Sequence, residues 1–578
     1  MPTLEWIGKD KVVNHHQQVP YRVLEAQYTH NAERSENMII RGDNLEALKS
    51  LLPKYEGMVK CIYIDPPYNT GNEGWVYNDN VNDPKIKKWL GEVVGKEGED
   101  LSRHDKWLCM MYPRLKLLQK LLSEEGAIFV SIDDMEIANL KILCNEVFGA
   151  NNHIATFIWQ KRYSPDVRTA ISDAHEFILC YAKNPEIFKA KRHLLPLTTA
   201  QTKQFSNPDN DPRGPWKPND FTAPGYRPNQ MYEILLPSGR TVTPPAGRCW
   251  RVKKDGFEQF VAEDRMIYGN NGDGVPAVKR FLSEMPGMVP WTWWNHEEVG
   301  HTQEGNKMLA AILGKAVFDY PKPVRLIERI IQIATDPDSI ILDSFAGSGT
   351  TAHAVLNMNK ADGGNRKFIL IEMMDYADSI TAERVKRVID GYSQDQEVVL
   401  FDEEITASNL ERGAELLAEA KAVAKDAKGK YSSVKKPVME DNHLKVVAVN
   451  KAKDAVPGTG GDFTFYDLGE ALLLPNGNLN ENVSADKIRE YVYYMETREA
   501  MEGIANGNPY FLGASRGAAY YFYYEKEAIT TLDHDFLATI PERADSYVIY
   551  ADLCTIPADE LVKYNITFKK IPRDIAKL

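Results

Sequence analysis

Two stretches of the 578-residue chain alternate apolar, strand-like runs with helical patterns, and a long stretch of different texture separates them. In residues 38–150, runs such as "MVKCIYI" and "GAIFVSID" are each followed by a helical pattern. In residues 301–395, "SIILD" and "KFILIE" flank another helix. Strands without polar alternation are typical of parallel sheets that helices cover on both faces. The sequence therefore predicts one doubly wound, mostly parallel α/β domain that is written in two pieces.

The other segments of the chain differ from these two pieces in composition. Residues 151–300 are crowded with Pro, Gly, Asn and Trp, including "WTWW", and we expect them to form an inserted domain. Residues 396–440 are charged and rich in Ala, which is typical of a solvated helical linker. Residues 441–578 are rich in Tyr and are predicted to form a separate α+β domain, and residues 1–37 form an N-terminal extension.

Composition limits the class of protein. Contents of 43% hydrophobic and 26% charged residues are those of a soluble globular protein. The chain has no apolar run of membrane-spanning length and starts without the apolar centre of a signal peptide, so we expect a cytoplasmic location and no membrane partner. The six cysteines include no CxxC pair, which argues against a zinc site, and we expect no metal. A net charge of −13 weakens a nucleic-acid hypothesis without excluding it, because a groove needs only local basicity.

A glycine turn follows the strand-like run "SIILD". In "ILDSFAGSGTTAHAV", Gly347 and Gly349 lie between a strand and a helix. Glycine there lets a ligand approach the backbone, and the start of the helix offers N–H donors. A phosphate-binding P-loop would need a Lys at the helix start, and none is present. A dinucleotide fingerprint is nominally matched, and a plain strand-to-helix turn that only requires glycine stays open.

Two carboxylates near this turn bear on the choice of ligand. Asp343 ends the strand before the turn, and Glu372 ends the next strand at the distance expected of an acid that binds ribose hydroxyls. A carboxylate at Asp343 would repel a pyrophosphate but would attract a cationic amino group. S-adenosylmethionine carries such a group, together with a sulfonium and ribose hydroxyls. The two acids therefore favour S-adenosylmethionine over a nicotinamide dinucleotide.

The run "KCIYIDPPYNTGN" ends a buried strand in an acid, two prolines and an aromatic ring. In an open α/β sheet, the ligand crevice lies beyond the carboxyl ends of the strands, where Asp65-Pro66-Pro67-Tyr68 is expected. Proline fixes φ and removes the N–H, so this corner is stiff and rich in acceptors beside a flat ring. Its complement is a planar heterocycle with an exocyclic amino group, such as a nucleobase. A base in a duplex would have to be flipped out to reach this corner. The alternative is a proline turn with an incidental tyrosine.

"DPPY" followed far along the chain by "FAGSGT" resembles the amino-methyltransferases of DNA, specifically the N6-adenine enzymes. The order of the two motifs, with an insertion between them, is that of the circularly permuted β class. The longer strings "IDPPYNTGN", "RHDKWLCMMYPRLKLL", "IFVSIDDMEIANL" and "YPKPVRLIERII" are similar to Mod subunits of type III restriction–modification systems and their solitary relatives. The resemblance covers residues 38–395.

The resemblance implies a role for each motif residue. Asp65 and the Pro66 carbonyl would bind the adenine N6 amino group, Pro67 would complete the rigid corner, and Tyr68 would stack on the base. The methyl group would pass directly from the sulfonium to N6, so the two motifs must line one cavity. For Lys322, in the family's "KP" segment, a helix-capping role is equally open. The cofactor would be held by Asp43, Lys322, Asp343, Phe345, Gly347, Gly349, Thr350 and Glu372.

Residues 151–300 are the predicted target-recognition region, and double-stranded DNA is the predicted substrate. Basic residues with interleaved aromatics suit contacts to phosphates and bases. For any one tryptophan, the alternative is that it belongs to the core of an ordinary inserted domain. The predicted DNA contacts are Lys161, Arg162, Arg168, Arg248 and Arg251.

Further partners come from the resemblance alone. It implies a homodimer and, in a restriction–modification system, a second subunit with helicase and nuclease activity. The chain itself has no Walker element and no nuclease motif, so any cleavage would belong to that partner. Two other functions stay open, an RNA base methyltransferase and a non-catalytic subunit that only recognises DNA.

Overall fold

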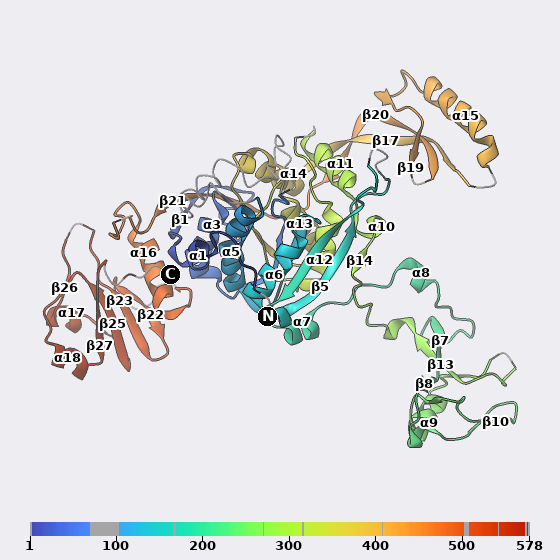
Figure 1. The fold of residues 1–578 in the computed structure, drawn as a ribbon, viewed down its shortest axis with the longest axis horizontal. Coiled ribbons are helices and arrows are strands. Elements are labelled where there is room, and N and C mark those ends of the chain that lie inside the picture. The colour runs from blue at the N-terminus through green and yellow to red at the C-terminus, as the bar shows by residue number, and fades with distance from the viewer. Residues whose placement is uncertain are drawn as a thin grey trace. The chain divides into compact units, whose positions relative to one another are not determined.

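The computed structural model describes residues 3–69, 103–165, 169–269, 271–314, 317–406, 409–440, 442–474, 476–501, 508–526, 528–541, 543–572 and 575. The chain forms two compact units. One consists of Met1–His193 and Trp291–Leu578, and the other of Leu194–Pro290 (Figure 1).

The larger unit is built on a ten-stranded sheet with the order β1-β21-β2-β16-β15-β3-β4-β6-β5-β14 (Figure 1). Most neighbouring strands are parallel, and the antiparallel pairs are β1 with β21 and β6 with its two neighbours. The strands are β1 (Arg22–His30), β2 (Met38–Arg41), β3 (Val59–Ile64), β4 (Leu122–Ile132), β5 (His153–Gln160), β6 (His175–Ala182), β14 (Trp293–Trp294), β15 (Ile340–Asp343), β16 (Lys367–Glu372) and β21 (Phe463–Ala471).

Two groups of helices pack around this sheet. Helix α5 contacts α3 and α6, and helix α13 contacts α12 and α14. Every residue of β3 is buried, as expected of a central strand between covering layers. The helices are α1 (Lys9–Val12), α2 (His15–Gln18), α3 (Asn44–Tyr55), α5 (Arg103–Leu121), α6 (Ile137–Phe148), α7 (Pro185–Lys191), α10 (His296–Val299), α11 (Thr302–Leu313), α12 (Val324–Ala334), α13 (Thr350–Asp362) and α14 (Glu383–Asp390).

The two sequence pieces of the α/β domain interleave in one sheet. Strands β16 and β15 come from the second piece, yet they lie between β2 and β3, which come from the first. The register pairs Asp343 with Leu370 and Ile341 with Cys61. This arrangement confirms the prediction of a mostly parallel, circularly permuted α/β fold.

The main sheet also recruits strands from segments that we expected to lie outside it. Strand β1 falls within residues 1–37, and β21 falls within residues 441–578. Strand β21 pairs with β1 on one side and with β2 on the other. Pairing between such distant segments leaves no local pattern in the sequence, which is why the expected extension and C-terminal domain did not include it.

The smaller unit, Leu194–Pro290, is shorter than the expected insertion at 151–300. The flanking strands β5, β6 and β14 belong to the ten-stranded sheet instead. The unit has its own core around Phe221, Ile234 and Trp250. Its elements are α8 (Thr199–Thr202), β7 (Trp216–Asp220), β8 (Thr222–Pro224), β9 (Ile234–Leu235), β10 (Thr241–Val242), β11 (Arg248–Trp250), α9 (Lys254–Ala262), β12 (Met266–Ile267) and β13 (Ala277–Phe281).

The expected linker at 396–440 is only partly helical. Helix α15 (Gly413–Asp426) is present, but the long strand β17 (Gly391–Glu404) precedes it and pairs with β20 (His443–Pro457). Further along, the four-stranded sheet β22-β23-β25-β27 has the mixed α+β character expected of this region. Its strands and helices are β22 (Phe511–Ser515), β23 (Ala518–Phe522), β25 (Ser546–Ala551), β27 (Ile566–Lys570), α16 (Ala485–Thr497), α17 (His534–Ala538) and α18 (Ala558–Lys563).

Among the described residues, no helix combines the length and the apolar character that crossing a bilayer would require.

Candidate active site

The corner after β3 holds its acid and its ring together. The hydroxyl of Tyr68 donates to Asp65 Oδ1 at 2.8 Å and to Glu176 Oε2 at 3.0 Å. Behind the corner, Trp107 Nε1 donates to the carbonyl of Pro67 at 2.7 Å. Because Trp107 is fully buried, this bond ties the proline turn to the core of the domain.

The residue after the corner adds a second anchor. Asn69 has a φ of 61°, a left-handed conformation that Asn adopts more readily than most residues. Its buried side chain donates to Glu136 Oε1 at 2.6 Å, and His104 Nδ1 lies 2.7 Å from the same oxygen. Glu136 was not selected from the sequence, because only the tertiary structure brings it to the corner.

The glycine turn between β15 and α13 is shaped around a carboxylate. Gly347 and Gly349 have φ angles of 51° and 81°, which residues with a Cβ rarely adopt. The N–H of Gly347 donates to Glu372 Oε2 at 2.8 Å, and the N–H of Met374 donates to Glu372 Oε1 at 2.9 Å. Glu372 therefore holds the turn from the neighbouring strand.

Asp343 is fixed in a similar way at the end of β15. Its Oδ1 accepts from the N–H of Phe345 at 3.0 Å, and its Oδ2 accepts from Thr351 Oγ1 at 2.5 Å. The Asp343 residue is only 2% exposed. The acid thus sits beneath the turn with both oxygens oriented by hydrogen bonds.

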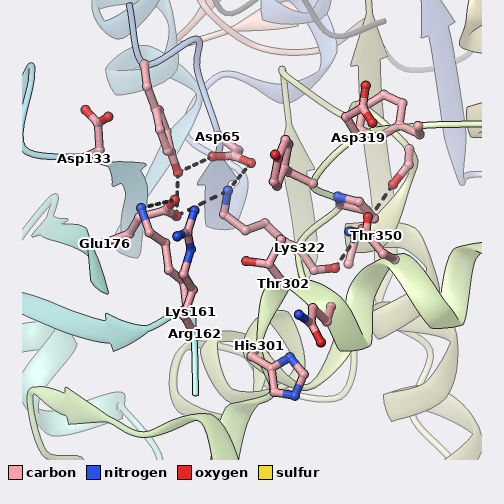
Figure 2. A pocket seen from close by; sticks show the side chains of 18 of the residues that line it. Asp65, Asp133, Lys161, Arg162, Glu176, His301, Thr302, Asp319, Lys322 and Thr350 are labelled. Carbon is pink, nitrogen blue, oxygen red and sulfur yellow. Dashed lines mark hydrogen bonds and ion pairs between the residues drawn. The ribbon is translucent and has the colours of Figure 1, made fainter. Parts of the chain in front are cut away.

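The corner and the glycine turn line one cavity of about 600 Å³. The prediction that these distant motifs share one cavity is therefore confirmed in the geometry of the larger unit. Figure 2 shows side chains from both motifs on its walls. The predicted residues that line it are Asp65, Pro66, Tyr68, Lys161, Arg162, Lys322, Asp343, Phe345, Gly347 and Thr350.

Four of the predicted catalytic and cofactor residues do not line this cavity. Pro67 is turned toward Trp107, while Gly349 forms the N-cap of α13 and Glu372 holds the turn from behind. Asp43 is the N-cap of α3, where it accepts from the N–H of Leu45 at 2.8 Å. Pro67, Gly349 and Glu372 thus lie behind or beside the corner and the turn, whereas Asp43 caps a separate helix.

Lys322 points at the corner acid. Its Nζ donates to Asp65 Oδ2 at 2.6 Å and lies 3.6 Å from Glu176 Oε2. On the other side of Glu176, Lys161 Nζ lies 3.4 Å from Oε1 and also pairs with Asp173 at 2.7 Å. Figure 2 shows Asp65, Lys322, Glu176 and Lys161 directed toward one another.

Glu176 was not predicted as a site residue. The signal available in the sequence was an acid at the start of the apolar run "HEFILCYA", because a carboxylate in a buried strand needs a partner. The partner itself could not be identified from the sequence, since Lys322 is distant along the chain and reaches Glu176 only through the fold.

Burial changes the titration of the acids around the cavity. It raises the pKa of Asp343 and that of Glu372 to about 7 in each case, against hydrogen bonds that oppose the rise. Burial also raises the pKa of Asp65, and the Lys322 ammonium opposes this rise. Asp65 and Asp343, which line the cavity, are therefore acids whose charge responds to a neighbouring cation.

The five predicted DNA contacts are split between the two units. Lys161 and Arg162 line the cavity of the larger unit. In the smaller unit, Arg248 is paired with Asp220 at 2.6 Å and Arg251 is exposed. Arg168 lies outside the described residues.

Comparison with known proteins agrees with this geometry. The DNA methylase family model matches residues 59–383, which contain both cavity motifs. The StyLTI Mod subunit of a type III restriction–modification enzyme from Salmonella typhimurium is 34% identical over 67% of this chain and 62% of its own. The EcoPI Mod subunit from Escherichia phage P1 is 34% identical over 64% of this chain and 63% of its own.

A shorter relative is covered more completely. The type II methyltransferase M.KpnI from Klebsiella pneumoniae is 31% identical over 59% of this chain and 81% of its own length. By contrast, the match spans somewhat less than two thirds of the two Mod subunits. The family match confirms the resemblance drawn from the proline corner and the glycine turn. The chain belongs to the DNA methylase family.

Proposed function

We propose that the protein is a site-specific DNA methyltransferase that moves a methyl group from S-adenosylmethionine to N6 of an adenine flipped out of the duplex. One observation carries the proposal: the Asp65 corner and the Gly347 turn line the same cavity. Methyl transfer requires a nucleophile and a methyl donor at contact distance, so their two binding motifs must meet in one place.

The residues of the cavity fit S-adenosylmethionine. Helix α13 starts at the glycine turn without a side-chain cap, so its first N–H groups suit the carboxylate of an amino acid. Asp343, at the same turn, suits the cationic amino group, while Glu372 supports the turn from the neighbouring strand by accepting from the Gly347 N–H. When bound, this cofactor supplies an electrophilic methyl group on a sulfonium.

The corner residues provide what the target base needs. An aromatic amine is a poor nucleophile because its lone pair is delocalised into the ring. Hydrogen bonds from N6–H to the carboxylate of Asp65 and the carbonyl of Pro66 favour a pyramidal nitrogen and stabilise its developing positive charge. The ring of Tyr68 offers a stacking face for the extruded base. No strong base is required before attack, because the methylated ammonium loses its proton readily.

Adenine is favoured over cytosine by the corner itself. Asp65 matches the pattern of the N6-adenine enzymes, which carry Asp at this position. Cytosine-N4 enzymes typically carry Ser there. The relatives named Mod subunits further support a modification role within a restriction–modification system. We infer a homodimer and, where such a system exists, a restriction partner. A DNA substrate agrees with the expected cytoplasmic location.

The decisive experiment expresses the chain in a host that lacks adenine methylation and reads its DNA by methylation-sensitive long-read sequencing. We expect N6-methyladenine at every copy of one short motif. Transfer of tritiated methyl groups to purified DNA and RNA separates the two substrates. Methylation of RNA alone would favour an RNA base methyltransferase, and no turnover on either would favour a non-catalytic subunit that recognises DNA.

A further inference from the structure

In this structure, a lysine occupies the position that the proposed function gives to the target base. Lys322 Nζ donates to Asp65 Oδ2 at 2.6 Å and lies 5.1 Å from the centre of the Tyr68 ring. The two groups proposed to bind and stack the adenine are thus engaged by one ammonium. A base cannot donate its amino group to that carboxylate oxygen until the ammonium has moved.

The ammonium is not free to move into water. The side chain of Lys322 is 10% exposed, and a buried charge that loses its counter-ion is costly. Glu176 offers a second carboxylate, because its Oε2 already lies 3.6 Å from Lys322 Nζ and its side chain is 11% exposed. A short shift of the flexible lysine chain would exchange one ion pair for another.

Glu176 is also held in place to receive it. The Tyr68 hydroxyl and the Lys161 ammonium both contact it, at 3.0 Å and 3.4 Å. Asp65, Lys322, Glu176 and Lys161 thus form an alternating row of two carboxylates and two ammoniums (Figure 2). When the base amino group takes the place of Lys322 on Asp65, its N6–H donates to the freed carboxylate oxygen, and the Lys322 ammonium stays paired with Glu176.

We propose that Lys322 is a displaceable stand-in for the target amino group, and that Glu176 is the positioning residue that receives Lys322 when the base enters. This inference rests on the proposed function and adds two roles to it. Lys322 keeps the buried Asp65 ionised before DNA arrives. Glu176 makes its release possible without leaving an unpaired ammonium in the cavity.

The test compares variants in their ability to extrude the target adenine. The substrate is a duplex with the methylation motif found by sequencing and with 2-aminopurine next to the target adenine, whose fluorescence rises when the adenine leaves the stack. S-adenosylhomocysteine is present, so no transfer occurs. Glu176→Gln keeps the shape of the side chain but removes its charge, so Lys322 should stay on Asp65 and the fluorescence rise should fall at least tenfold.

A double variant separates this role from a merely structural one. In Glu176→Gln with Lys322→Met, the ammonium that competes for Asp65 is absent and the charge balance is kept. We expect extrusion to rise at least threefold above that of Glu176→Gln but to stay below that of the wild type, because Asp65 also loses the ammonium that keeps it ionised. Recovery after a second mutation is not expected if Glu176 only stabilises the fold.

Asp173→Asn provides the matched control. Asp173 and Glu176 both pair with Lys161, at 2.7 Å and 3.4 Å. Unlike Glu176, Asp173 is half exposed and does not line the cavity. Its loss should leave extrusion within twofold of the wild type. Isothermal titration with S-adenosylhomocysteine should give similar affinities for the wild type, Glu176→Gln and Asp173→Asn, because neither change alters the glycine turn.

Three results would overturn the inference: a double variant no better than Glu176→Gln, an Asp173→Asn variant equally impaired, or normal extrusion by Glu176→Gln. If Glu176→Gln does not fold, the double variant is compared directly with the wild type. A loss of extrusion of more than tenfold then counts against the transfer of Lys322 from Asp65 to Glu176. Failure of the proposed function is separate, since it would appear as a wild type that does not methylate DNA.

Discussion

Asp65 works in a place that disfavours its charge. Burial raises its pKa, and the Lys322 ammonium at 2.6 Å opposes that rise. The acid is kept ionised by a neighbour rather than by water, which preserves its strength as an acceptor in a low-dielectric cavity. The corner therefore couples its reactivity to the state of one lysine.

Replacement of Asp65 by Ala should abolish methyl transfer while cofactor binding is kept. The side chain contacts the proposed base site, whereas the cofactor residues come from the glycine turn. We expect a loss of at least about 100-fold in kcat, the scale of a lost electrostatic contact in a transition state. Tritiated-methyl transfer measures the rate and calorimetric titration measures the affinity. An equal loss of both would contradict the assignment of Asp65 to the base.

Cofactor binding should strengthen as pH rises toward neutrality. Asp343 and Glu372 have a pKa of about 7 in the folded protein, raised from 3.8 and 4.5 by burial. Asp343 lines the cavity, so a cationic ligand favours its ionised form, and affinity should rise by up to about tenfold per pH unit below pH 7. Calorimetry at pH 6 and pH 8 checks this. The variant Asp343→Asn should reduce the change.

Without cofactor, the free energy of unfolding should fall as pH rises, whereas cofactor affinity rises. A raised pKa of an acid means that folding favours its protonated form. The stabilisation from Asp343 and Glu372 is therefore complete near pH 4 and is lost as pH rises through 7. Thermal unfolding without cofactor should occur at a lower temperature at pH 8 than at pH 6, and Asp343→Asn should narrow that difference.

The site residues that could be predicted are those that lie next to one another in a short sequence motif. The corner and the glycine turn carry their acids, prolines and glycines side by side, so their character follows from the sequence alone. Glu176 has no such neighbours, and its meaning comes from Lys322 and Tyr68, which reach it through the fold. Lys322 itself was expected at the cofactor, whereas in this structure its ammonium pairs with Asp65.

At the scale of elements, the turn before α13 depends on backbone conformations that glycine alone adopts readily. Gly349 has a φ of 81°, and a Cβ there would lie 3.1 Å from the carbonyl oxygen of Thr381. The Thr381 side chain in turn donates to the Gly347 carbonyl at 2.6 Å. A change at Gly349 would thus disturb the whole turn, including its contact with Glu372.

Gly349→Ala should weaken cofactor binding by at least tenfold and lower the free energy of unfolding by about 1–2 kcal/mol, the cost of a left-handed residue with a Cβ. Gly363 is the matched control, because it caps the other end of α13 with a φ of 72° and open space around it. Gly363→Ala should cost similar stability and leave affinity unchanged. Thermal unfolding and calorimetry separate the two effects.

Elements with a strong local pattern were the predictable ones. Strands β3, β15 and β16 lie within the apolar runs that indicated them. Strand β17 lies partly in a segment whose charge and Ala content favoured a helix, and its pairing with β20 outweighs that preference. Local propensity is a weak guide wherever a distant strand supplies the hydrogen bonds.

At the scale of the whole molecule, the smaller unit can be treated as a separable module. Leu195 and Met288 exchange two backbone hydrogen bonds, of 2.8 Å and 2.7 Å, where the chain enters and leaves the unit. A short Gly-Ser loop could therefore replace residues 196–287. The core around Trp250 leaves together with the unit.

This excision should abolish site-specific methylation while cofactor binding is retained. The cavity residues all lie in the larger unit, and the predicted recognition residues Arg248 and Arg251 lie in the excised one. Calorimetry with S-adenosylhomocysteine measures the first property, and long-read sequencing of host DNA measures the second. Retained methylation at the same motif would show that recognition resides elsewhere.

The position of β21 in the sequence determines when the main sheet can be completed during synthesis. Strand β1 bonds to β21 and to no other strand of the ten-stranded order, and β21 is made more than four hundred residues later. Until the ribosome has passed Ala471, β1 has no partner strand and the backbone groups on one edge of β2 are unpaired. Exposed strand edges of this kind favour aggregation. A fragment that stops after β16 would remain in that state permanently, even though it contains every residue of the cavity.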